Sequence, residues 1–133
     1  QGVKEGLIDV IVSDHKPEDE ESKRLPFAQA AEGSIGIETL LSLALELYHN
    51  GSLPLKKIIE TITSNPAKIL KINKGNLKKG SDADLCIFDI DKPWKVDVLK
   101  LKSKSKNSAV ENRKLQGKVM MTYLKGESVF KIQ

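Results

Sequence analysis

The sequence predicts an α/β segment followed by an all-β segment, with the boundary near residue 73. Three observations support this division. A short β-branched run lies near the start at residues 10–12, patterns typical of helices follow it, and only strand patterns occur after residue 73. A chain of 133 residues is long enough for one ordinary domain or two small ones.

Residues 7–12 predict a strand that is buried on both faces, because β-branched runs suit such strands. Asp14 and His15 follow it directly, and Pro17 prevents any regular continuation. A carboxylate and an imidazole at the end of a buried parallel strand occupy the place where α/β enzymes carry their working groups. The alternative is that Asp14 caps a turn and His15 is solvated.

A polar loop and three helices are expected next. The segment from 15 to 33 has the length of a functional surface loop. Apolar residues recur at helical spacing over 37–48, with Ser34 near the start and Asn50-Gly51 as the stop, and they recur again over 55–62. A third, short helix is predicted with Asn65 as N-cap and Pro66 at its first position. His49 is interpreted as a surface residue at a helix end.

The second segment is predicted to contain strands only. Residues 85–88 indicate a short apolar strand. Residues 118–124 and 127–132 indicate a β-hairpin around Lys125-Gly126. Cys86 lies in the apolar run LCIF and is interpreted as buried packing rather than as a catalytic thiol.

Composition narrows the functional class. Apolar residues make up 39% and charged residues 30%, no apolar run reaches the roughly 18 residues of a membrane span, and the first residues lack a signal-peptide pattern. A single cysteine predicts a reducing, cytoplasmic setting. Residues 100–108 carry four lysines and no acid, but they lack aromatic residues and arginine. We therefore expect a solvated loop there, with no nucleic-acid or membrane partner.

Four stretches resemble dihydroorotases, which are members of the amidohydrolase superfamily. They are SDHKPEDEESKRLPFAQAAEGSIGIETLL, TSNPAKIL, GNLKKGSDADLCIFDIDKPWKVD and LQGKVMMTYLKGESVF, and they occur in the family's order. The resemblance covers nearly the whole chain but only the last third of such an enzyme. It implies that residues 1–73 form the C-terminal part of a (β/α)8 TIM barrel, with 7–12 as its eighth strand. Residues 74–133 would then be strands of the composite β-sandwich.

The resemblance also implies site residues and a cofactor. Asp14 would be a zinc ligand and the general base and acid, with two zinc ions in the family. Glu18 stands where the family motif Asp-His-Ala-Pro-His has its final histidine, and a carboxylate there would repel an anionic substrate. Ordinary turn and packing roles are the alternative for the loop residues. The substrate-binding positions implied are His15, Glu18, Pro26, Phe27 and Gly33.

Three functional hypotheses follow from the resemblance. In the first, the parent enzyme interconverts dihydroorotate, a cyclic amide, and carbamoyl aspartate. The other zinc ligands would lie upstream, so this chain alone is expected to be inactive and to expose apolar surface, and its partner would be a separate N-terminal half or a second copy. In the second, the chain is a non-catalytic remnant or a structural subunit that pairs with such a half or with a transcarbamoylase. In the third, it is a hydantoinase- or allantoinase-like cyclic amidase.

Overall fold

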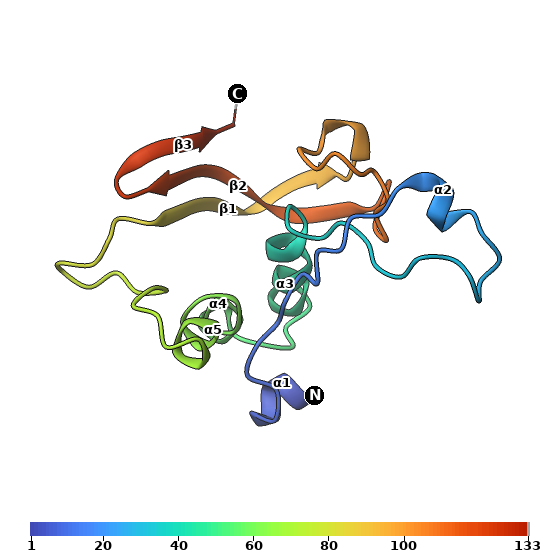
Figure 1. Cartoon of the computed structure of the whole chain (residues 1–133). Helices are drawn as coiled ribbons and strands as arrows, with labels where there is room; N and C mark the ends of the chain where they lie inside the picture. The colour runs from blue at the N-terminus through green and yellow to red at the C-terminus, as the bar shows by residue number, and fades with distance from the viewer. Residues whose placement is uncertain (133) are drawn as a thin grey trace.

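A three-stranded antiparallel sheet and the helix that packs on it form the centre of the computed structural model, which describes residues 1–132 (Figure 1). The strand order is β1-β2-β3, so β2 is central and the other two are edges. The strands are β1 (Leu85–Lys95), β2 (Lys114–Leu124) and β3 (Glu127–Lys131). The main helices are α3 (Leu40–His49), α4 (Leu55–Ile62) and α5 (Ser64–Ile69).

The predicted hairpin is confirmed. β2 and β3 pair around Lys125 and Gly126, whose φ angles of 51° and 86° are both positive, as a tight two-residue hairpin turn requires. β1 is longer than the strand predicted at 85–88, and its later half includes Pro93. Proline is tolerated there because β1 pairs with β2 alone and is therefore an edge strand.

The three predicted helices are present, and two of them start at other residues than predicted. α4 spans the predicted residues, whereas α3 begins at Leu40 rather than at residue 37. α5 begins at Ser64 with Thr63 at its N-cap, so the prediction of Asn65 as N-cap is wrong. The Asn65 side chain instead donates a hydrogen bond of 2.9 Å to the Asp9 carbonyl.

The predicted strand at 7–12 is absent from the described part of the chain. Leu7 and Val12 are 77% and 69% exposed, and the Ile11 N–H donates to the carbonyl of Thr61, in the last turn of α4, rather than to a strand. The expected strand is one of a parallel sheet, which needs hydrogen-bonded neighbouring strands, and residues 1–132 offer none beside this run. The sequence also gave no sign of two one-turn helices, α1 (Gly2–Glu5) and α2 (Glu20–Lys23).

Helix α3 lies between the sheet and α4 (Figure 1). On one side Leu45, which is 0% exposed, lies against Gly117 of β2. On the other side Ala44 packs with Leu53 and Ile58 in an apolar cluster. The two segments predicted from the sequence therefore share a core at α3. No helix among residues 1–132 is both long and apolar enough to cross a membrane.

A buried polar contact ties α3 to both β1 and β2. The Ser42 hydroxyl donates to the Gly117 carbonyl at 2.5 Å, and the Trp94 indole N–H lies 3.1 Å from both of these oxygens. Gly117 has a φ of 88°, and a Cβ at this position would collide with Leu45. Only glycine therefore suits this crossing of helix and sheet.

Cys86 differs from its prediction. The side chain is exposed rather than buried, because the helix that covers the sheet, α3, packs mainly on β2. Partial desolvation raises the pKa of its thiol, which is the opposite of what an activated cysteine requires.

An exposed ion cluster joins the start of β1 to the segment that follows α5. Lys74 Nζ lies 2.6 Å from Asp82 and 2.5 Å from Asp84, and Asp84 also accepts from the Lys125 N–H. Hydrogen bonds from Lys74 and Lys125 lower the pKa of Asp84, and the two aspartates raise the pKa of Lys74.

We expect Lys74→Met to lower the free energy of unfolding only within a pH window. The contribution of Asp84 to the free energy of unfolding is complete above its ordinary pKa of 3.8 and is lost as the pH falls through its lowered pKa. The Lys74 contribution is complete below 10.5 and is lost as the pH rises through the raised value. Urea unfolding of Lys74→Met and of the exposed control Lys79→Met, at pH 7 and at pH 2–3, measures this. An equal deficit at both pH values would contradict the prediction.

Candidate functional site

Asp14 lies in a turn with a left-handed backbone. Its φ is 42°, an uncommon value for a residue other than glycine, and its side chain is exposed. The turn passes so close to Gly36 that a Cβ there would lie 2.6 Å from the Ser13 carbonyl oxygen. Aspartate tolerates this conformation better than most residues, and backbone strain of this kind is concentrated at functional sites.

His15 is held by the backbone rather than solvated. Its Nδ1 atom accepts hydrogen bonds from the N–H groups of Gly36 at 3.1 Å and Ile37 at 3.4 Å. Because both donors are backbone amides, Nδ1 carries no proton and the neutral ring carries its proton on Nε2. A ring in this tautomer presents a hydrogen-bond donor at Nε2, which suits substrate binding rather than metal ligation.

The loop that follows does not bring all the predicted residues together. Phe27 is 100% exposed and Pro26 is exposed beside it, so neither side chain is held in a packed site in this chain. Gly33 lies at the other end of the loop, next to Ser34, which bridges to His15. Lys23 closes the loop from inside, with its ammonium 2.5 Å from the Ala31 carbonyl and 2.9 Å from that of Gly33.

Glu18 lies at the start of this loop, where the family motif has its final histidine. It is half-buried, and both of its backbone groups are engaged by the segment 101–108. The Glu18 N–H donates to Asn107 Oδ1, and the Ser105 hydroxyl donates to the Glu18 carbonyl at 2.5 Å.

The lysine-rich segment 100–108 was expected to be a solvated loop, and this expectation is wrong in part. Several of its residues are half-buried against the loop after Asp14. Glu38 Oε1 accepts from the N–H groups of Lys102 and Ser103, and Lys106 folds back onto the Leu101 and Ser103 carbonyls. The Glu38 contacts span 64 and 65 positions of sequence, so no local pattern could have indicated them.

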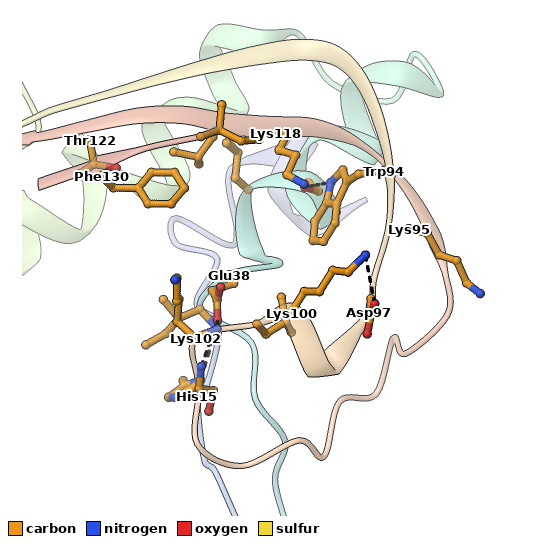
Figure 2. A pocket seen from close by; sticks show the side chains of 17 residues that line it. His15, Glu38, Trp94, Lys95, Asp97, Lys100, Lys102, Lys118, Thr122 and Phe130 are labelled. Atoms are coloured by element: carbon orange, nitrogen blue, oxygen red, sulfur yellow. Dashed lines mark hydrogen bonds and ion pairs between the residues drawn. The ribbon is translucent and has the colours of Figure 1, made fainter. Parts of the chain in front are cut away.

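A cavity of about 670 Å³ lies beside this site. Figure 2 shows the side chains that line it. His15, Glu38 and Lys102 lie together at one end, while Lys118 lies over the Trp94 ring at 4.9 Å near the other. Asp97 and Lys100 pair at 3.5 Å between them. His15 is the lining residue nearest in sequence to Asp14, and the rest of the wall comes from the start of α3, the three strands and the segment 100–103.

His49 also differs from its interpretation as a surface residue. The residue is half-buried, its ring meets that of Tyr48 edge-on, and among the described residues its Nε2 atom is buried without a hydrogen-bond partner. The reason is that the end of α3 packs near Pro93 and Leu115, which line a shallow surface pocket with it.

The described residues do not form a metal centre. Across positions 1–132 no three His, Cys, Asp or Glu side chains are grouped so that they could hold an ion. Asp14 is exposed and His15 presents an N–H rather than a lone pair, so this pair alone does not fit the zinc site that the resemblance implies.

The sequence matches the amidohydrolase family over residues 1–129. It is 47% identical to the dihydroorotase of Ehrlichia chaffeensis across all 133 residues, which cover 30% of that protein. Two solved structures are also similar, and the chain covers 30% of each. One is an L-hydantoinase (dihydropyrimidinase) from Arthrobacter aurescens, with a TM-score of 0.88 and 35% identity over 98% of this chain. The other is the dihydropyrimidinase of Brevibacillus agri NCHU1002, with a TM-score of 0.91 and 23% identity over 98%.

The chain thus spans about 30% of the length of the curated relatives it matches. The structural similarity extends over nearly all of its α/β architecture, including the sheet and the helices α3–α5. The sequence similarity runs through the Asp14 turn, the loop after it and the hairpin without a gap in coverage. The chain therefore belongs to the amidohydrolase family, in which it is similar to the dihydroorotases.

Proposed function

We propose that this chain supplies part of the active site of an enzyme that reversibly hydrolyses the cyclic amide of dihydroorotate to carbamoyl aspartate, a step of pyrimidine biosynthesis. The observation that carries the proposal is the 47% identity to a dihydroorotase over the whole chain. The exposed Asp14 on its strained turn and the adjacent His15 N–H are the groups of this chain best suited to the reaction.

Asp14 is the group that moves the proton. In hydrolysis, water adds to the amide carbonyl and the C–N bond breaks, so one proton must leave the water and one must reach the departing nitrogen. The Asp14 carboxylate can take the first and deliver the second. His15 Nε2–H is the donor offered to a substrate oxygen, and Pro26, Phe27 and Gly33 are the proposed substrate contacts of the loop.

Membership of the family implies a metal cofactor, which we propose to be zinc with Asp14 as one ligand. Residues 1–132 group no further ligands with Asp14, so we propose that the remaining ligands come from outside them. We further propose that 1–73 belong to the barrel of the complete enzyme and 74–133 to its β-sandwich. The partner would be a polypeptide that covers the exposed side chains around Leu7 and Val12, or a second copy of the chain, in the cytoplasm.

A chimeric dihydroorotase tests the proposal. In this chimera the present chain replaces the matching segment of the Ehrlichia chaffeensis enzyme. We expect the chimera to bind stoichiometric zinc and to hydrolyse dihydroorotate, and the isolated chain to do neither. A folded chimera that binds zinc but does not turn over dihydroorotate would contradict the proposal and favour a non-catalytic role.

The 35% identity to an L-hydantoinase favours one second candidate, a cyclic amidase of hydantoin type. The same proton transfer by Asp14 would serve such substrates. Hydrolysis of hydantoin by the chimera at a higher kcat/KM than that of dihydroorotate would favour this reading.

Glu18→Gln in the chimera is expected to lower KM for dihydroorotate about fivefold. The substitution removes a half-buried negative charge from the position where the family motif carries a histidine. Two unit charges about 4 Å apart repel by about 1 kcal/mol in water and by more where water is excluded. Glu21→Gln, on the exposed helix α2, is the matched control. An unchanged KM in Glu18→Gln at low salt would show that Glu18 does not face the substrate.

A further inference from the structure

We propose that Asn107 is a positioning residue that clasps both ends of the loop between His15 and Ser34, and so holds the substrate-contacting residues of that loop in place. The part of this inference that concerns substrate binding rests on the proposed function. Asn107 belongs to the connection between β1 and β2, far from the loop in sequence. Neither the sequence patterns nor the similarity to relatives assigns it a role.

The two polar atoms of the Asn107 side chain reach opposite ends of the loop. Its Oδ1 atom accepts from the Glu18 N–H at 3.4 Å and lies 2.6 Å from the Ser105 hydroxyl. Its Nδ2 atom donates to the Gly33 carbonyl at 3.1 Å. One amide group therefore joins the first and last turns of the loop to each other.

The clasp continues to His15 through the backbone. The Asn107 carbonyl accepts from the Ile35 N–H at 2.9 Å. The next residue, Gly36, donates to His15 Nδ1 and thereby determines which ring nitrogen carries the proton. Displacing Asn107 would therefore loosen the loop and the support of His15 together.

Only an amide side chain of this length can make both side-chain contacts. Aspartate keeps the acceptor for Glu18 but has no N–H for Gly33, and its charge would face the Gly33 carbonyl. Leucine has a similar shape but neither polar atom, so it makes neither hydrogen bond and leaves both ends of the loop unheld. The two substitutions therefore separate the contributions of the two contacts.

Amide hydrogen exchange of the intact chain tests the clasp directly. We expect the Glu18 amide to exchange at least about tenfold faster in Asn107→Leu than in the wild type, and to keep most of its protection in Asn107→Asp. Trypsin should cleave faster after Lys23 and Arg24 in both variants. Asn73→Asp makes the same change as Asn107→Asp at an exposed position. It should alter neither the exchange rate of the Glu18 amide nor the rate of trypsin cleavage. If the Glu18 amide of a folded Asn107→Leu variant exchanges as slowly as in the wild type, the clasp is overturned.

Steady-state kinetics of the chimeric dihydroorotase test the positioning role. We expect Asn107→Leu to raise KM for dihydroorotate about tenfold and to change kcat less than twofold, because the loop contacts substrate and does not transfer the proton. An unchanged KM alongside faster exchange would overturn the positioning role and leave a structural clasp. An inactive wild-type chimera would contradict the proposed function and the positioning role with it, while hydrogen exchange would still decide the clasp.

Discussion

Replacing Asp14 with asparagine in the chimeric dihydroorotase is expected to lower kcat for dihydroorotate by about 10²- to 10⁴-fold, the usual contribution of a positioned general acid–base. Asparagine is the informative substitution because it removes the titratable oxygen and still tolerates the left-handed backbone, whose φ is 42°. Alanine would change the backbone strain as well as the charge, so its effect would have two causes.

The control for Asp14→Asn is Asp91→Asn. Asp91 is an exposed aspartate on the edge strand β1, so the same chemical change there should leave kcat and the free energy of unfolding unchanged. Zinc content should be measured in both variants, because a lost ligand and a lost proton acceptor would lower kcat alike. A kcat within threefold of the wild type for Asp14→Asn would contradict the role assigned to this carboxylate.

The sequence predicted those parts of the fold whose signals are local. The stripe that includes Ala44 and Leu45 indicated α3, and Lys125-Gly126 indicated the hairpin, because side-chain spacing and turn conformation depend on neighbours in sequence. The end of β1 was missed because aspartates and Pro93 argue against a strand in general. They are tolerated on an edge strand, and edge position is a property of the assembled sheet.

The prediction of the opening strand was wrong, and the contacts of Asn107 were not predicted at all, for a different reason. Residues 7–12 carry a strand pattern, but pairing needs neighbouring strands that residues 1–132 do not supply. Asn107 reaches Glu18 and Gly33 across separations of 89 and 74 residues, which leave no periodic trace in the sequence. Asp14 and His15 were proposed as site residues from both the strand-end pattern and the resemblance, whereas the hydrogen bonds of His15 and the backbone strain of Asp14 required the structure.

Leu45→Ala is expected to lower the free energy of unfolding by about 2–5 kcal/mol, the range found for large-to-small substitutions in a core. The Leu45 side chain is 0% exposed. It fills the space that Gly117 leaves free because glycine has no side chain. This free energy would be lost from the contact that joins α3 to the sheet. Urea denaturation of the isolated chain, followed by the fluorescence of Trp94 on β1, measures it.

Leu99→Ala removes the same atoms from a side chain that is 80% exposed, so it should change the free energy of unfolding by less than about 0.5 kcal/mol. Equal effects of the two substitutions would show that α3 does not depend on the sheet for its position. A loosened α3 should also affect the site, because α3 begins four residues after Gly36, whose N–H holds His15. If Leu45 anchors α3, then Leu45→Ala should also speed hydrogen exchange of the Gly36 amide, although no contact between the Leu45 side chain and His15 is involved.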